Sequence, residues 1–427
     1  MSRRTSSVVL AACAALATIV SGARADVETT VRDLARSVRE NYVFPEVGEK
    51  AAAMLEANLE SGAYDDIDGI MLAQRLTTDL QQLTHDRHFR VFPAPPDAGP
   101  ASEPEDEPAP TGPLGFRRIE RLDGNIGYVD MTEFARRQFA EPMVHAAMQL
   151  LQGSDALIFD MRGNGGGDPE TVQAMCTYLF DPGQPVHLNS LYNRPTDTTR
   201  EFWTQPEILK CDAMPDTPVW VLTSNFTFSG AEEFTYNLKT RKRATIVGER
   251  TGGGAHPVDP VRLEGGPFVA MIPVGRAINP VTGDDWEGTG IEPDVVVPAG
   301  DALDTAIGLA LETLSESDDP VVADRAAWGL IGRRVAAGGE PIDEPAMREI
   351  AGDYGERQIE VRDGGLWYSR AVAAAGWRRL ICVGEDTFVL EGVPGFRLEV
   401  DRSGDGDIKG LRGIYRQGLV DYSERTD

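Results

Sequence analysis

Hydrophobic residues recur at helical spacing through residues 26–92. The clearest run is four leucines spaced four, four and three positions apart, Leu72, Leu76, Leu80 and Leu83. Leucines at this spacing fall on one face of a helix. Two earlier stretches have the same character and are separated by a break that ends in a proline. The pattern predicts a small bundle of three helices at the N-terminal end.

Residues 113–315 show a different pattern, in which short apolar runs alternate with amphipathic stretches of helical period. The runs are IGYVDM (126–131), ALIFDM (156–161), VWVLT (219–223) and ATIV (244–247). Each is bounded by residues that favour turns, as strands are. Strands that alternate with helices predict an α/β core.

The last part of the chain, residues 350–427, lacks the helical period. Its polar and apolar positions alternate, and Asp-Gly, Gly-Glu-Asp and Ser-Gly-Asp-Gly sequences interrupt them. This pattern predicts a small antiparallel β-domain. Between the bundle and the core, residues 93–112 are rich in proline and acidic residues and predict an extended linker.

Residues 1–25 have the features of an export signal. A basic start is followed by an apolar run over residues 8–20, which is too short to span a bilayer, and by Ala23-Arg24-Ala25 before Asp26. We therefore expect an exported, periplasmic or secreted protein without a membrane span. A short transmembrane anchor and a lipoprotein with lipidated Cys13 are the alternatives.

Composition narrows the function classes. The 427 residues predict two or three domains, and 41% apolar residues suffice for a buried core. A net charge of −27 disfavours nucleic acid as a partner, because phosphate binding needs basic patches. The spacing of the cysteines matches no zinc motif.

The strongest chemical signal is the segment LTSNFTFSGAEEF, residues 222–234. An apolar strand ends at Thr223, and Ser229 stands where a helix begins. A hydroxyl there lies near unpaired backbone N–H groups and the positive end of the helix dipole, which suits a nucleophile whose intermediate carries an oxyanion. An ordinary helix N-cap is the alternative for Ser229.

A nucleophilic serine needs a base, and the chain has five histidines. His88 lies in THDRHFRVF, where the helical region gives way to an extended segment, and His85 is its nearest competitor. His256, in GGGAHP, is the other rival. A surface histidine is the alternative for each.

Two further segments supply candidate groups. The run Arg162 to Asp168 contains four glycines directly after a strand, so its N–H groups can approach a ligand closely. An oxyanion hole and a tight turn are both compatible with it. Glu287 lies in the glycine-rich segment TGDDWEGTGIEPDV, where its carboxylate can orient an imidazole, or simply face solvent.

Seven segments stand in a fixed order between about residues 30 and 300. They are NYVFPEV (41–47), DRHFRV (86–91), IGYVDMTEF (126–134), DMRGNGGG (160–167), TSNFTFSGAEEF (223–234), VGERTGGGAHP (247–257) and WEGTGIEPD (286–294). Together they resemble the tail-specific peptidase family, and within it the branch of the tricorn core and interphotoreceptor retinoid-binding protein.

The resemblance implies a crotonase-like α/β core and serine-type peptidase activity on peptides or proteins. It places the nucleophile at Ser229, the base at His88 and the supporting acid at Glu287. It assigns the oxyanion donors to the N–H groups of Gly230 and Gly166. It implies neither a metal nor an organic cofactor.

Two departures separate the chain from the tail-processing branch. That branch uses a lysine base, and the aligned position here is Gly254. It also carries a peptide-binding PDZ domain, for which residues 93–112 leave no room. Arg87 stands where the tricorn-like branch often has a glycine or serine next to its histidine. A secreted carrier of apolar ligands on the same fold and an esterase-like hydrolase are the alternative functions.

Overall fold

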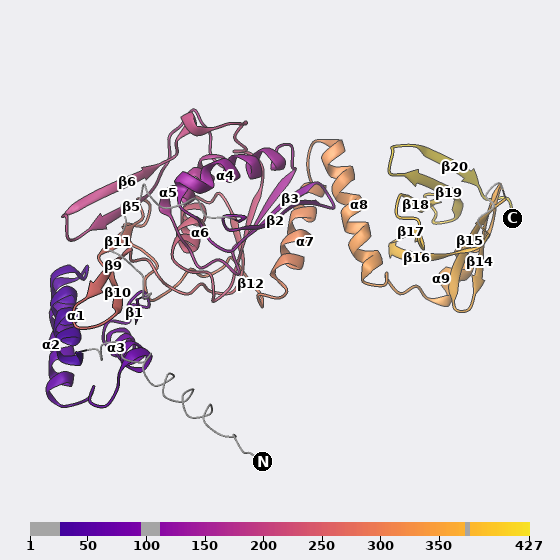
Figure 1. Ribbon diagram of the computed structural model, residues 1–427. Coiled ribbons are helices and arrows are strands. Elements are labelled where there is room, and N and C mark those ends of the chain that lie inside the picture. The colour runs from indigo at the N-terminus through magenta and orange to yellow at the C-terminus, as the bar shows by residue number, and fades with distance from the viewer. Residues whose placement is uncertain (1–25, 95–111, 372–375) are drawn as a thin grey trace, which may run out of the picture. The chain divides into compact units, whose positions relative to one another are not determined.

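The structure, a computed structural model, describes residues 26–94, 112–371 and 376–427 (Figure 1). The expected export signal and most of the expected linker lie outside these residues. The chain divides into two compact units. Of the described residues, the first comprises 26–94, 112–120 and 127–306, and the second comprises 121–126, 307–371 and 376–427. Each unit is described by itself below.

The first unit begins with three helices, α1 (Val27–Asn41), α2 (Pro45–Glu60) and α3 (Gly69–Thr84). Leu72, Leu76 and Leu80 are fully buried, as their spacing predicts. The helices share a hydrophobic core with an antiparallel sheet whose strand order is β1-β10-β9. Its strands are β1 (Arg90–Pro93), β9 (Val258–Leu263) and β10 (Phe268–Pro273). The predicted bundle is therefore present, and a sheet from a distant part of the sequence completes its core.

A six-stranded sheet with the order β12-β8-β7-β4-β3-β2 forms the centre of the first unit. Its strands are β2 (Phe116–Leu122), β3 (Ile126–Met131), β4 (Ala156–Asp160), β7 (Val219–Thr223), β8 (Thr245–Gly248) and β12 (Val295–Val296). β4, β7, β8 and β12 pair in parallel. The predicted runs at 126, 156, 219 and 244 thus form neighbouring strands of one sheet.

Helices α4 (Arg137–Leu151), α5 (Pro169–Thr177) and α6 (Gly230–Thr240) cover one face of this sheet (Figure 1). Leu157 and Phe159 of β4 and Val219 and Val221 of β7 point into the core that the helices close. Successive side chains of a strand point to opposite faces of the sheet. Every second residue of these strands therefore faces the helices.

A third sheet, with the order β11-β5-β6, lies in the same unit. Its strands are β5 (His187–Asn193), β6 (Thr198–Trp203) and β11 (Gly275–Ile278), and the 3-10 helix η2 (Pro206–Ile208) follows β6. All pairings are antiparallel. Leu191 of β5 and Ala277 of β11 pack with Trp286, which places this sheet beside the site described below.

The second unit contains α8 (Pro320–Ala336) and α9 (Glu344–Ile350). Helix α7 (Ala302–Ser315) begins in the first unit and, from Ile307 onward, belongs to the second. Eight antiparallel strands follow in sequence order: β13 (Gly352–Tyr354), β14 (Arg357–Arg362), β15 (Gly365–Arg370), β16 (Arg378–Gly384), β17 (Thr387–Leu390), β18 (Phe396–Arg402), β19 (Ile408–Tyr415) and β20 (Val420–Glu424). Two-residue connections such as Asp363-Gly364 allow this simple up-and-down order.

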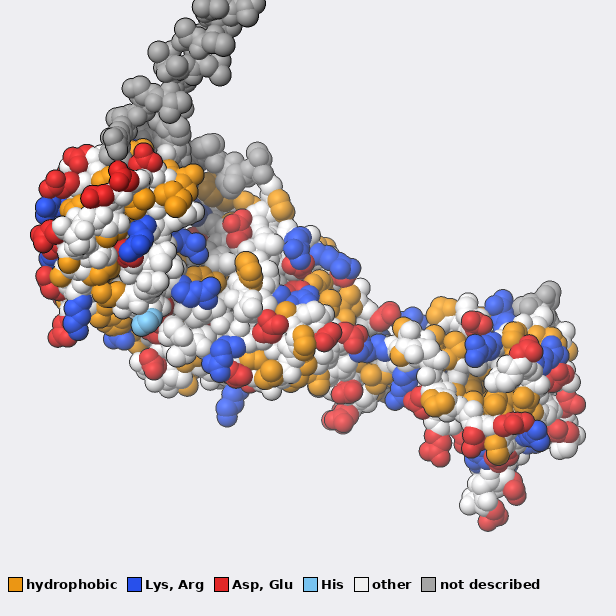
Figure 2. All heavy atoms as spheres, turned by 90° about the horizontal axis from the view of Figure 1, so that it is seen from below, with side chains coloured by type: hydrophobic (Ala, Val, Ile, Leu, Met, Phe, Trp, Pro, Cys, Tyr) orange, Lys and Arg blue, Asp and Glu red, His pale blue; other side chains and the backbone are white. Residues whose placement is uncertain are grey.

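The mixed α/β fold and the C-terminal antiparallel sheet that the sequence predicts are confirmed. The crotonase-like assignment and the predicted domain boundaries stay predictions. Within the described residues, no helix is both long and apolar enough to cross a bilayer. Acidic and basic side chains are interspersed over the face shown in Figure 2.

Candidate active site

Parallel strand pairing brings the two strongest sequence motifs together. The glycine run follows β4 and the Ser229 segment follows β7, and these strands are neighbours. The carboxyl ends of parallel strands lie at one edge of a sheet, where open α/β sheets place their ligands. The two loops touch there, because the Phe228 N–H donates to the Asn164 carbonyl at 3.1 Å. A Cβ added to Gly166 would lie 2.7 Å from the Ser229 Cβ.

Ser229 has a backbone conformation that L-amino acids rarely adopt. It immediately precedes α6, with φ at 52° and ψ at −122°. Ser229 is the N-cap residue of α6 and forms a capping box with Glu232, but an ordinary N-cap residue has negative φ, so the capping role alone does not account for this geometry. A strained serine on a sharp turn between strand and helix is the arrangement that presents a nucleophile at a sheet edge.

Glu232 holds this turn in place. Its carboxylate is fully buried and accepts hydrogen bonds from four donors. They are Ser229 N–H at 2.9 Å, Thr251 Oγ1 at 2.5 Å, Gly253 N–H at 2.7 Å and Gly254 N–H at 2.8 Å. Burial raises the pKa of Glu232, and these hydrogen bonds oppose the rise. Through this one side chain, the start of α6 is tied to the loop after β8.

The glycine run offers backbone donors next to Ser229. The Gly166 N–H donates to Asn164 Oδ1 at 2.8 Å. A Cβ added to Gly230 would lie 3.0 Å from the Gly167 nitrogen, so these two backbones approach closely. Within the described residues, no group accepts a hydrogen bond from the N–H of Gly230 or Gly167. Gly167 is therefore a second candidate beside the predicted Gly166.

His88 packs against the ring of Phe228, the residue before Ser229. The two ring centroids are 4.6 Å apart, and the histidine is 9% exposed. Neither ring nitrogen of His88 has a hydrogen-bond partner among the described residues, Ser229 included. A Cβ at Gly254 would lie 2.6 Å from His88 Cε1 and 2.2 Å from Phe228 Cζ. These two rings thus fill the space that a side chain at position 254 would need.

A second histidine in the same cluster is already paired. His256 Nδ1 lies 2.6 Å from Asp86 Oδ2, and both side chains are buried. Burial by itself lowers the pKa of His256, but the hydrogen bond and charge of Asp86 outweigh it, so the pKa is raised. Burial likewise opposes ionisation of Asp86, yet its hydrogen bond with His256 and the nearby His88 ring, whose Nδ1 lies 3.7 Å from Asp86 Oδ1, hold its pKa well below the usual range.

Glu287 completes the cluster. Its Oε2 accepts the Ala255 N–H at 2.5 Å and lies 3.6 Å from His256 Nδ1 and 4.0 Å from His88 Nδ1. The other oxygen of Glu287 is buried without a partner among the described residues. Burial, together with the charge of Asp86, raises the pKa of Glu287 to about 7. The predicted supporting acid therefore lies close to both histidines but is hydrogen-bonded to neither.

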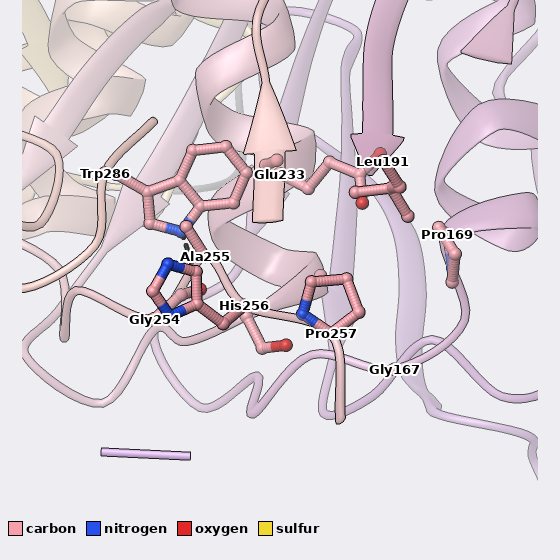
Figure 3. Close-up of a pocket in the computed structure, with 12 residues that line it drawn as sticks. Gly167, Pro169, Leu191, Glu233, Gly254, Ala255, His256, Pro257 and Trp286 are labelled. Atoms are coloured by element: carbon pink, nitrogen blue, oxygen red, sulfur yellow. Dashed lines mark hydrogen bonds between the residues drawn. The ribbon is translucent and has the colours of Figure 1, made fainter. Parts of the chain in front are cut away.

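One cavity opens beside Ser229, and a second is lined by the preceding residue, Phe228. The smaller, ≈ 80 Å³, is drawn in Figure 3. The residues that line it are Gly167, Pro169, Leu191, Ser229, Gly230, Glu233, Gly254, Ala255, His256, Pro257, Ala277 and Trp286. The larger, ≈ 530 Å³, is lined by Arg87, Arg90, Gly165, Asn225, Phe226 and Phe228.

The structure places the predicted residues Ser229, His88 and Glu287 around one loop, residues 252–256, although they are not joined by hydrogen bonds. Sequence inspection missed Glu232 and Asp86. The spacing Ser229-x-x-Glu232 is a capping-box pattern, and this pattern could have indicated the role of Glu232 from the sequence. Nothing in the sequence pairs Asp86 with His256, which is 170 positions away. Predicted rival His85 is exposed at the end of α3.

Asp86, His256 and Glu287 are also the one group among the described residues whose ligand atoms lie close enough to hold a metal ion, all within 4.8 Å of one another. The direct bond between Asp86 and His256 satisfies both groups without an ion. The expectation that the site uses no metal stays a prediction.

Family models match two parts of the chain. Residues 125–297 match the model of peptidase family S41, and residues 12–117 match the N-terminal domain of peptidase S41 in eukaryotic IRBP. Together these ranges take up more than half of the 427 residues.

Similar proteins include a carboxyl-terminal-processing protease from Synechocystis, 31% identical over 176 residues, which are 40% of this chain and 38% of the relative. The tricorn protease of Thermoplasma volcanium is 27% identical over 181 residues, which are 42% of this chain and 16% of the relative. The chain thus spans less than half the length of these curated relatives. A solved structure of a putative peptidase from Parabacteroides merdae has a TM-score of 0.48 and 20% identity, over 67% of this chain and 96% of that one.

Proposed function

This chain belongs to peptidase family S41, and from this premise we propose that it is a serine-type peptidase that uses Ser229 as its nucleophile. The observation that carries the proposal is the strained backbone of Ser229 at the start of α6. Such strain has a cost and persists where the surrounding structure enforces it, which Glu232 does here. A carrier of apolar ligands would need no strained serine beside free backbone donors.

We assign the general base to His88. A base must have an unprotonated nitrogen, and the two nitrogens of His88 are uncommitted, whereas His256 is held by Asp86 and its pKa is raised. The lysine of the tail-processing branch has no counterpart, since a side chain at Gly254 would overlap Phe228 and His88. A shift of the His88 ring toward Ser229 completes the hydrogen bond, which apo sites often lack.

The proposed chemistry is acyl transfer through an acyl-enzyme. Ser229 Oγ attacks the peptide carbonyl while His88 takes its proton and then returns it to the leaving amine. Water then attacks the ester and releases the acid. Glu287 stabilises the imidazolium of His88 through charge.

The oxyanion accepts hydrogen bonds from the N–H of Gly230 and from a second donor in the glycine run. Gly166 is the donor that the sequence predicts, but it must leave Asn164 Oδ1 to act, whereas Gly167 is uncommitted. One such donor contributes about 10²- to 10³-fold in kcat.

The test is hydrolysis of an unstructured protein by wild type and by Ser229→Ala. We expect the variant to fold normally and to lose on the order of 10⁴-fold or more in kcat. Ser224→Ala is the matched control, because Ser224 lies in the same loop but donates to the Arg162 carbonyl at 2.6 Å. Near-normal turnover by Ser229→Ala would rule out the proposed nucleophile.

A further inference from the structure

The small cavity beside Ser229 is lined mostly by glycine and apolar residues, with His256 at its wall and Glu233 as its one acidic residue. In Figure 3, Trp286 and Gly254 lie on one side and Leu191 and Pro169 on the other, with Glu233 between them. Trp286 is fixed in this wall, since its indole N–H donates to the Gly254 carbonyl at 2.7 Å. The cavity therefore has one wall fixed by a hydrogen bond, and the side chain of Glu233 lines it.

Glu233 has no counter-ion. It is 5% exposed, and no lysine or arginine in the described part of the chain forms an ion pair with it. Burial raises the pKa of Glu233 to about 8, and the charge of Asp168 adds to this effect. The amides of Asn189 and Asn237 lie nearby and lower the pKa by less, but their own polar atoms have no hydrogen-bond partner.

A buried carboxyl group without a counter-ion is costly, and a protein keeps one where it has a use. Glu233 stands one helical turn after Ser229 on α6, so its position is fixed relative to the nucleophile. The proposed mechanism leaves it without a role, and its neighbour Glu232 already performs the structural task at this turn.

We propose that the cavity receives the lysine or arginine side chain of the substrate's acyl-side residue, with Glu233 as the counter-ion that selects it. This inference rests on the proposed peptidase function. The oxyanion donors hold the carbonyl of the acyl-side residue, and Gly167 and Gly230 both line the cavity. The side chain of that residue is consequently the one nearest the opening.

Size and lining fit a basic side chain. A volume of ≈ 80 Å³ corresponds to about five to eight water-sized groups. The side chains of lysine and arginine have about five and seven non-hydrogen atoms. Their aliphatic stems suit the walls of Leu191, Ala277 and Trp286, and the charged end reaches Glu233. The net charge of −27 also favours the approach of cationic peptides.

Two peptidyl aminoalkyl phosphonates test the inference, one with lysine and one with norleucine at the acyl-side position. Norleucine has the same stem without the charge, so the ratio of the two rates of Ser229 labelling isolates the ammonium group. We expect wild type to react at least tenfold faster with the lysine probe. Glu233→Gln should bring this ratio close to one, whereas Glu292→Gln at an exposed position should leave it unchanged.

Each outcome decides a separate question. Labelling of Ser229 at equal rates by both probes would overturn the role of Glu233 and leave the peptidase proposal standing. Absence of any label at Ser229, by either probe or by a simple fluorophosphonate, would overturn the peptidase proposal and this inference with it. If Glu233→Gln does not fold, the ratio of the two labelling rates in wild type still tests the inference, because equal rates would overturn it.

Discussion

At the scale of single residues, two imidazoles and two carboxylates share one buried cluster. Asp86 bonds to His256 through its side chain and also accepts the backbone N–H of His88 at 3.0 Å. His256 is therefore hydrogen-bonded to Asp86, whereas both ring nitrogens of His88 are without a hydrogen-bond partner among the described residues. Glu287 lies within 4.0 Å of each, so its charge acts on both.

Because His88 and His256 differ in this way, substitutions at His88, His256 and His85 should lower kcat by different factors. His88→Ala should lower kcat by about 10⁴-fold, because the base is removed, and His256→Ala by a smaller factor, because it only positions Asp86 and Glu287. His85→Asn is the control, since His85 is exposed and asparagine tolerates its left-handed φ of 59°. Steady-state kinetics decide the matter, and a loss confined to His256→Ala would move the base to that residue.

Glu287 predicts a pH-dependent stability. Its pKa is about 7 in the folded protein, against an ordinary value of 4.5, so the unfolded chain ionises first as pH rises. The contribution of Glu287 to folding is therefore neutral below pH 4.5, becomes unfavourable from there to pH 7, and then stays constant at about 3 kcal/mol. Compared with wild type, Glu287→Gln should be more stable at about pH 8 and equally stable at about pH 4.

Urea unfolding at several pH values measures this difference. Glu292→Gln is the control, because Glu292 is exposed and its ion pair with Arg250 should contribute less than about 1 kcal/mol at any pH. A difference between Glu287→Gln and wild type that does not change with pH would show that Glu287 is not buried against Asp86 as described.

At the scale of elements, the site is assembled by the ends of three parallel strands. The loops after β4, β7 and β8 meet at one edge of the sheet, and Glu232 at the start of α6 joins the second to the third. A carboxylate suits this role because every group that faces it is a donor. The arrangement explains how a strained serine is kept in place.

Glu232→Gln should therefore destabilise the fold and slow labelling of Ser229. The amide nitrogen would face backbone N–H groups, which leaves buried donors unpaired at a cost of about 1–3 kcal/mol each. Glu233→Gln, one position along the same helix, is the control for stability, since the groups near its carboxylate are the side-chain amides of Asn189 and Asn237 rather than backbone N–H groups of the loop after β8. Equal free energies of unfolding for the two variants would contradict the role given to Glu232.

The elements were largely predictable from sequence, and the contacts between them were not. Periodicity indicates β4, β7 and α6 and puts Ser229 at the mouth of a helix, because these are local properties of the chain. The pairing of Asp86 with His256 depends on how α3 and the loop after β8 pack, which no local pattern encodes. The uncommitted Gly167 N–H likewise follows from its close approach to Gly230.

At the scale of the whole molecule, every residue assigned to the site lies in the first compact unit. Asp26, the residue that follows the expected cleavage site, is held by contacts within this unit. The Asp26 N–H donates to the Gly265 carbonyl at 2.6 Å, and its carboxylate caps α1 by accepting the Thr29 N–H at 3.3 Å. Cleavage before Asp26 would leave both contacts in place.

Exported protein should accordingly begin at Asp26, which N-terminal sequencing and intact mass can show. A protein retained with residues 1–25 would contradict the export signal. A mass that includes lipid on Cys13 would instead establish the lipoprotein alternative.

The central claim is that Ser229 is a reactive nucleophile, and the most direct measurement is the mass of the protein after treatment with a fluorophosphonate. Wild type should gain the mass of one phosphonyl group, on the peptide that contains Ser229, and Ser229→Ala should gain none. Ser224→Ala should be labelled like wild type. Labelling of Ser229→Ala to the same extent, or a label on another residue in wild type, would contradict the account.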